Sequence, residues 1–305
     1  MIFYGVILAK TIIVLLRATR QELLMKFLKI LLFCTYLILL ACNPSSNSGV
    51  KSPNLNKVDA NRTCVPESEL LAGNIVGGQV VQTSDIDSKK VMMLVSGGQL
   101  CTAVAIDKKI LLTAAHCIAG KKSNTYVTFY SSHSCESGYN KNKHNAGILK
   151  TVVHENYNSA LAADKMIADI ALVVLEEEIP AGYAIYKIAK SDAINSLNDL
   201  YLYGYGRVLS SGGGAGMLRK SVLNSLRYKI NFADRKIEID QKAGGGICQG
   251  DSGGPSFVLV GDEMQVLGIS SYVKGDKNDI CFDEGYQTLA DSYKDWIDYK
   301  RLVYK

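Results

Sequence analysis

Three short motifs in this chain could together perform acyl-transfer chemistry. His116 stands in the string TAAHC, Asp169 begins the string DIAL, and Ser252 stands in the string CQGDSGGP. A serine hydroxyl is a weak nucleophile near neutral pH, and an adjacent imidazole can take its proton and return it. Taken singly, each motif has an ordinary explanation, because Gly-Asp-Ser-Gly often forms a turn and a buried histidine is often a core residue. Their joint occurrence favours a catalytic group.

In this order along the chain, the motifs resemble those of the chymotrypsin/trypsin family of serine proteases. The resemblance implies that Ser252 attacks a peptide carbonyl, that His116 is the general base and acid, and that a buried Asp169 fixes the imidazole tautomer. It also implies that the backbone N–H groups of Gly250 and Ser252 bind the oxyanion. The expected activity is that of a serine endopeptidase, without a cofactor or a metal ion.

The same resemblance implies an all-β fold of two six-stranded antiparallel β-barrels packed together, with a C-terminal helix. Residues 75–305 are long enough for such a domain. They contain many short apolar segments separated by Gly, Asn, Asp and Ser, among them Val91–Val95, Tyr126–Tyr130 and Asp169–Leu175. The amphipathic pattern of Asp291–Tyr299 predicts the helix.

The string IVGG, which begins at Ile75, resembles the activation sequence of the family. The resemblance implies a zymogen that is cleaved between Asn74 and Ile75, after which the new α-amino group pairs with Asp251. An activating protease that requires Arg or Lys should not cut after Asn74. The alternative is that Ile75 simply begins a strand.

Substrate-pocket residues can be assigned by their offset from these motifs. Gly246 falls where trypsin-like members carry the Asp that binds a cationic side chain, and Val273 would narrow a wall while Gly285 leaves the opposite wall open. This pattern favours small or uncharged residues on the amino side of the scissile bond, as in elastases. The alternative is a pocket that prefers cationic side chains, with Asp283 or Glu284 as the acidic partner. The expected substrate-binding residues are Gly246, Ile247, Ser271, Tyr272, Val273 and Gly285.

The cysteines indicate disulfides and an oxidising compartment. The family resemblance implies the pairs Cys101–Cys117 and Cys248–Cys281. A bridge between Cys64 and Cys135 is a further hypothesis, and it would keep the propeptide attached after activation. Metal binding is the rival reading of the cysteines, but the chain has no C-x-x-C string.

The amino-terminal region resembles an export signal. Residues 25–41 contain a basic start and a short apolar run that ends in LLAC, which resembles a bacterial lipoprotein signal with Cys42 as the lipidated residue. We expect residues 42–74 to form a flexible tether and propeptide. Residues 1–24 are then an extension upstream of the true start, or else a real additional hydrophobic segment. The expected location is membrane-anchored, at the periplasmic face or cell surface, or secreted.

The net charge of +5 is mild, with both signs interspersed, so we expect no nucleic-acid partner. The expected partners are protein or peptide substrates, an activating protease and a membrane through the lipid, and the chain is expected to be a monomer. The competing hypothesis is a non-catalytic protein-binding module on the same fold, because a fold does not by itself determine a function.

Overall fold

The computed structural model describes residues 78–82, 84–120, 124–129, 145–194, 198–208, 213–276 and 280–305. The predicted signal, tether and propeptide lie outside these residues, as do Ile75 and Cys135. The hypotheses that depend on Cys42, on cleavage before Ile75 and on a Cys64–Cys135 bridge therefore stay predictions. Within the described part of the chain, no helix has both the length and the apolar character needed to cross a membrane.

The first sheet has seven antiparallel strands in the order β6-β5-β2-β3-β4-β8-β7. Strands β2 and β3 are joined by Gly97 and Gly98, whose φ angles of 56° and 78° suit the tight hairpin turn that matches the strand twist. Strands β4 and β8 are buried along their whole length, which explains their continuous apolar runs. The strands are β2 (Met92–Ser96), β3 (Gln99–Ala105), β4 (Ile110–Thr113), β5 (Tyr126–Thr128), β6 (Asn145–Ala146), β7 (Ile148–Val153) and β8 (Ala171–Leu175).

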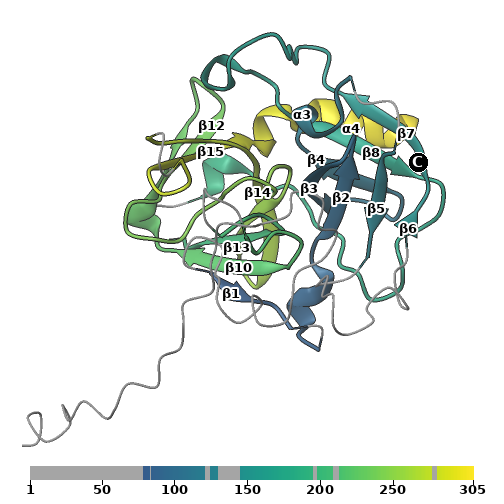
Figure 1. The fold of residues 1–305 in the computed structure, drawn as a ribbon. Helices are drawn as coiled ribbons and strands as arrows, with labels where there is room; N and C mark the ends of the chain where they lie inside the picture. The colour runs from purple at the N-terminus through teal and green to yellow at the C-terminus, as the bar shows by residue number, and fades with distance from the viewer. Residues whose placement is uncertain are drawn as a thin grey trace, which may run out of the picture. The chain divides into compact units, whose positions relative to one another are not determined.

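The second sheet has eight antiparallel strands in the order β1-β10-β9-β13-β14-β15-β12-β11. Strand β1 precedes the first sheet in the sequence but pairs with β10 at the edge of the second sheet (Figure 1). The strands are β1 (Gln79–Val80), β9 (Leu200–Gly204), β10 (Arg219–Leu223), β11 (Tyr228–Asn231), β12 (Lys236–Asp240), β13 (Pro255–Val260), β14 (Glu263–Lys274) and β15 (Glu284–Leu289).

Each sheet curls into a barrel-like half of the fold, as Figure 1 shows. The predicted fold class of two antiparallel β-barrels with a C-terminal helix is confirmed. The strand counts are eight and seven rather than six and six, because short strands such as β1 and β6 extend the sheet edges.

The C-terminal helix α4 runs from Lys294 to Val303, after a 3-10 turn at Ala290–Tyr293. The sequence pattern located this helix but placed both of its ends too early. Buried Ile297 packs into a hydrophobic core that includes residues of both sheets. Beyond the predicted end, Arg301 pairs with Asp107 at 3.1 Å, a long-range contact that periodicity cannot reveal. The other described helical turns are α3 (Ala115–Ile118) and 3-10 turns at Ile86–Lys89, Ala163–Lys165, Ser191–Ala193 and Ser225–Arg227.

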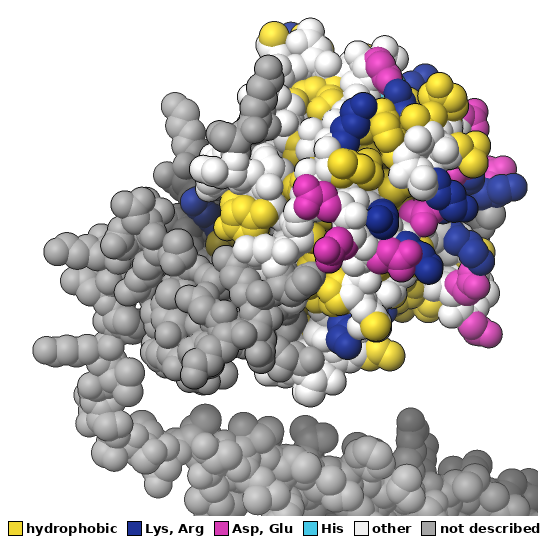
Figure 2. Space-filling model, turned by 90° about the vertical axis from the view of Figure 1, so that its right-hand side faces the viewer, with side chains coloured by type: hydrophobic (Ala, Val, Ile, Leu, Met, Phe, Trp, Pro, Cys, Tyr) yellow, Lys and Arg dark blue, Asp and Glu magenta, His cyan; other side chains and the backbone are white. Residues whose placement is uncertain are grey.

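The surface carries both signs of charge. Figure 2 shows one face of the molecule, on which acidic and basic side chains alternate among apolar ones. Charged side chains of the described residues also form ion pairs, for example Lys108 with Glu178 at 3.4 Å and Lys294 with Asp298 on α4. Exposed pairs of this kind contribute little to stability, typically about 0–1 kcal/mol each.

Candidate active site

His116 and Asp169 meet because β4 and β8 pair. Thr113, the last residue of β4, lies opposite Ala171, the first residue of β8. The short helix α3 follows β4 and carries His116, while Asp169 precedes β8. The backbone N–H of His116 donates to Asp169 Oδ1 at 2.9 Å, and His116 Nδ1 lies 2.8 Å from Asp169 Oδ2. A carboxylate only accepts hydrogen bonds, so this contact requires the proton on Nδ1 and leaves Nε2 as an acceptor.

Asp169 lies in a buried site that favours its charged form. Its exposed fraction is 2%, and Oδ2 also accepts a hydrogen bond from Ser271 Oγ at 2.5 Å. Burial alone raises the pKa of Asp169, but the hydrogen bonds and charge of His116 and the Ser271 hydroxyl outweigh it and hold that pKa below its ordinary value. Ser271, expected from the sequence to contact substrate, therefore also holds the carboxylate.

Ser252 lies at the junction of the two sheets, just before β13. Its carbonyl oxygen accepts a hydrogen bond from Thr102 N on β3 at 2.8 Å. The Cys117 sulfur lies 3.9 Å from His116 Nε2 and 3.6 Å from the Ser252 carbonyl oxygen. Ser252 and His116 therefore flank the same sulfur atom, although 135 residues separate Cys117 from Ser252.

The backbone around Ser252 leaves two N–H groups available. Among the described residues, the amides of Asp251, Gly253 and Gly254 donate to carbonyl oxygens, whereas those of Gly250 and Ser252 do not. Gly250 has a φ of 100° and Gly253 a φ of 80°, a region that favours glycine. A side chain at Gly253 would also overlap the backbone of β3. Two unpaired donors at such a turn suit a developing oxyanion.

Asp251 is the second buried carboxylate of the site, with an exposed fraction of 1%. It accepts hydrogen bonds from Gly206 N at 2.7 Å and from Cys248 N at 2.8 Å. Burial raises the pKa of Asp251 to about 6, although these amides and the charge of Arg219 act to lower it. Asp251 is thus a carboxylate whose negative charge is only partly compensated.

Both disulfides that the family resemblance implies are present. Cys101 and Cys117 have Cα atoms 6.3 Å apart, and Cys248 and Cys281 have Cα atoms 5.2 Å apart. The first bridge links β3 to the helix of His116, and the second links the segment before Ser252 to the segment before β15. In the described chain, the group closest to a metal-ligand set is His116 with the two sulfurs of the first bridge, which as a disulfide offers no thiolate.

A family model described as trypsin matches residues 75–297. The chain belongs to the trypsin family. Its relatives include chymotrypsin-like elastase family member 1 of Macaca fascicularis, 26% identical over 73% of this chain and 88% of that protein. Chymotrypsin-2 of Vespa crabro is 30% identical over 65% of this chain and 88% of that protein.

Among solved structures, a mouse-brain serine protease, neuropsin, matches with a TM-score of 0.58 and 20% identity. The match covers 73% of this chain and 98% of the neuropsin chain, and it supports the fold alone. The family match supports a serine peptidase as the general class of this trypsin-family protein.

A cavity of about 240 Å³ opens beside Ser252 of this trypsin-family chain. Four of the six residues predicted to bind substrate line it, and Gly246 and Gly285 do not. The apolar side chains of Val273 and Ile280 contribute to its walls. The full lining is Ile247, Cys248, Gln249, Ser252, Ser270, Ser271, Tyr272, Val273 and Ile280.

Gln241 occupies the space beside Gly246 and Gly285. Its fully buried carboxamide donates from Nε2 to Ile247 O at 3.0 Å and to Cys281 O at 2.6 Å, and accepts from Ile247 N at 2.7 Å. A side chain at either glycine would overlap this carboxamide. The wall beside Gly285 is therefore filled rather than open. Gln241 was not among the residues predicted from the sequence, because no local motif marks a residue that reaches this wall from the end of β12.

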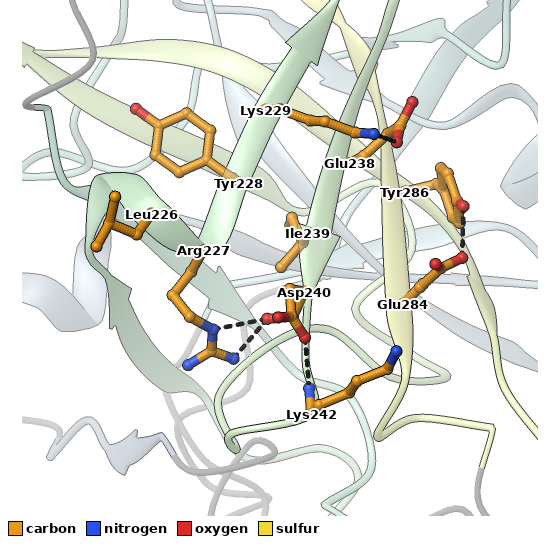
Figure 3. Close-up of a pocket in the computed structure, with 10 residues that line it drawn as sticks. All are labelled: Leu226, Arg227, Tyr228, Lys229, Glu238, Ile239, Asp240, Lys242, Glu284 and Tyr286. Carbon is orange, nitrogen blue, oxygen red and sulfur yellow. Dashed lines mark hydrogen bonds and ion pairs between the residues drawn. The ribbon is translucent and has the colours of Figure 1, made fainter.

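The two acidic residues that could have given the pocket a preference for cations do not line the cavity beside Ser252. Asp283 pairs with Lys242 at 3.1 Å, and Glu284 accepts a hydrogen bond from Tyr286 Oη at 2.6 Å. Glu284 lines a separate surface cavity of about 290 Å³ between β11, β12 and β15, shown in Figure 3. No acidic side chain is among the described residues that line the cavity beside Ser252.

Proposed function

We propose that this protein is a serine endopeptidase that hydrolyses protein or peptide substrates through an acyl-enzyme. The observation that carries the proposal is the 2.8 Å contact between His116 Nδ1 and buried Asp169, which leaves Nε2 as a base. Nε2 takes the proton of the Ser252 hydroxyl as its oxygen attacks the scissile carbonyl, and the imidazolium then protonates the leaving amine. Water attacks the acyl-enzyme by the reverse sequence and regenerates Ser252.

The oxyanion of each tetrahedral intermediate would be bound by the Gly250 and Ser252 amides. Their lack of acceptors among the described residues supports this role. Loss of one such donor typically lowers the rate by about a hundred- to a thousandfold. The positive φ of Gly250 therefore bears directly on activity.

The proposed specificity is for small or uncharged residues on the amino side of the scissile bond. Val273 and Ile280 narrow the cavity beside Ser252, and Gln241 fills the space behind it. Among the described residues that line this cavity, no carboxylate could pair with a substrate cation. An unpaired buried charge is strongly unfavourable.

The proposed activation is cleavage between Asn74 and Ile75 by another protease. The new α-amino group would then pair with Asp251. Support comes from Asp251, a buried carboxylate with a raised pKa, because a nearby cation would stabilise its charged form. A lipid on Cys42 and a Cys64–Cys135 bridge would keep the active enzyme on the membrane. Non-reducing electrophoresis after cleavage should then show one species, which reduction separates into two.

A fluorophosphonate probe tests the main proposal, because it reacts with an activated serine and not with an ordinary hydroxyl. We expect the cleaved protein to be labelled and to hydrolyse peptides, and the Ser252→Ala variant to do neither while remaining folded. A folded wild type that is cleaved at Asn74 and yet unlabelled would reject the enzyme and favour the non-catalytic binding module.

A further inference from the structure

Arg219 is the bulkiest side chain that is completely buried in the described chain. Burial lowers the pKa of Arg219 to about 10, and the charge of Asp251 opposes this fall. The guanidinium thus stays charged near neutral pH. A buried charge is strongly unfavourable unless hydrogen bonds and an opposite charge compensate it.

Three contacts of Arg219 are made with neutral groups of the neighbouring turn. Nη1 donates to the carbonyl oxygens of Gly214 and of Met217, the second at 3.3 Å, and Nη2 lies 3.6 Å from Met217 Sδ. These contacts satisfy N–H groups and hold the turn at residues 213–217. They do not supply a negative charge.

The register of the second sheet points Arg219 toward Asp251. Arg219 lies directly opposite Gly204 on β9, and directly opposed residues of antiparallel strands project to the same face. At Gly204 that face is occupied by the Asp251 carboxylate, because a side chain there would overlap Oδ1 of Asp251. Arg219 therefore leaves the sheet on the face where the buried carboxylate lies.

The strand that carries Arg219 also pairs with β1, which follows the proposed cleavage site in the sequence. On its other side, Arg219 lies opposite Val80 of β1, five residues after Ile75. A fully extended chain spans at most about 3.6 Å per residue, so a new terminus at Ile75 stays within about 18 Å of Val80. If the ammonium pairs with Asp251, as proposed above, it and Arg219 would serve the same carboxylate.

We propose that Arg219 is a built-in countercharge for Asp251, which holds the Gly250–Ser252 loop in its oxyanion-binding form before the chain is cleaved. This inference rests on the proposed serine peptidase. Arg219 is a positioning residue, because it acts through Asp251 and does not touch the substrate. Its consequence is that the uncleaved chain reacts with substrates and serine probes, and that cleavage accelerates an existing activity.

Fluorophosphonate labelling followed by reducing electrophoresis tests this inference, because the uncleaved and cleaved chains separate by size. The substitution Asn74→Arg in every protein allows controlled cleavage by trypsin. We expect the uncleaved band to be labelled. Arg219→Met should slow that labelling by about tenfold, because an opposite charge close to a carboxylate typically lowers its pKa by about one unit or more. Arg219→Lys should restore most of the labelling. The cleaved band should change much less, since the Ile75 ammonium then pairs with Asp251.

Lys220→Gln is the matched control, because it removes a positive charge from the next residue of β10, which pairs with Asp87. It should leave both bands unchanged. If Arg219→Met does not fold, Arg219→Gln replaces it, since it can still donate to the Gly214 carbonyl without the charge. An uncleaved band labelled no faster than the Ser252→Ala background, or equal slowing of both bands, overturns the role of Arg219. Absence of labelling from the cleaved wild type would instead remove the proposed function.

Discussion

Asp169 and Asp251 are both buried carboxylates near Ser252, with exposed fractions of 2% and 1%, but their pKa values shift in opposite directions. Asp169 accepts hydrogen bonds from the imidazole and backbone of His116 and from Ser271. Asp251 accepts two from backbone amides. Two equally buried carboxylates thus have pKa values shifted in opposite directions, because their hydrogen-bond and charge partners decide whether the charged form is favoured.

The difference separates a carboxylate whose negative charge is fully compensated from one whose negative charge is only partly compensated. Asp169 already has the donors that its negative charge needs. Asp251 has only part of them, with Arg219 as a neighbouring cation, so a new ammonium would change its state strongly. We infer that catalysis is organised around Asp169 and regulation around Asp251.

Asp169→Asn should have the largest effect. The amide nitrogen cannot accept the Nδ1 proton, so it favours the imidazole tautomer that cannot act as the base. The value of kcat should fall by about four orders of magnitude, as is typical for this carboxylate in proteases with a Ser-His-Asp triad. Steady-state kinetics on a peptide ester or amide measure it. Asp164→Asn, an exposed neighbour, should retain activity, and a small loss in Asp169→Asn would contradict the role of this residue.

The pH dependence of stability should reveal the incomplete pairing of Asp251. Its pKa rises from 3.8 to about 6 on folding, so the folded state binds the proton more tightly. This contribution to stability is fully present below the unfolded pKa and is lost as pH rises through about 6. A shift of this size corresponds to about 3 kcal/mol.

Denaturant unfolding of the uncleaved Ser252→Ala protein at several pH values measures the loss. The Asp251→Asn version, which lacks the titrating group, is the reference at each pH. After cleavage at Asn74, the Ile75 ammonium should remove the loss. The free energy of unfolding could instead change with pH equally with and without Asp251, or equally before and after cleavage. Either result would argue against a regulatory role of Asp251.

Gln241→Ala should change specificity by a smaller factor. Gln241 is a buried neutral amide with its hydrogen bonds satisfied, so it needs no countercharge, unlike Asp169 and Asp251. Removing it deepens the cavity, and the preference for Phe over Ala before the scissile bond should rise by about tenfold. Competition between two peptides measures the ratio of kcat/KM. Gln265→Ala, a partly exposed site on β14, is the control, and an unchanged ratio would exclude Gln241 from specificity.

Glu155→Gln should have the smallest effect, although Lys300 lowers the pKa of Glu155 to about 2. Glu155 accepts hydrogen bonds from Lys300 Nζ and Trp296 Nε1, both at 2.6 Å, and its side chain is 59% exposed. Water screens such a pair, so the free energy of unfolding should fall by less than about 1 kcal/mol. Thermal melting measures this change in the free energy of unfolding. A larger fall would show that an exposed carboxylate can matter as much as a buried one such as Asp169.

Local sequence was sufficient to identify the motifs of the proposed active site and the main elements of the fold. A few consecutive residues are enough to recognise the motifs of His116, Asp169 and Ser252. The same holds for the alternation of short strands with turns and for the C-terminal helix. Short-range rules apply there, because glycine conformation and strand or helix periodicity depend on near neighbours. These rules did not predict the C-terminal end of α4, because Lys300 and Arg301 pair with residues far away in the chain.

Tertiary structure alone decided which groups surround each motif. Ser271 reaches Asp169 across 102 residues, and Gln241 reaches Cys281 across 40. Arg219 faces Asp251 only because β10 and β9 pair in a register that sets it opposite Gly204. The physical reason is that a strand projects alternate residues to opposite faces, so a slip of one residue would exchange these neighbours. The sequence by itself determined the reactive groups, and the strand register determined which charges compensate them.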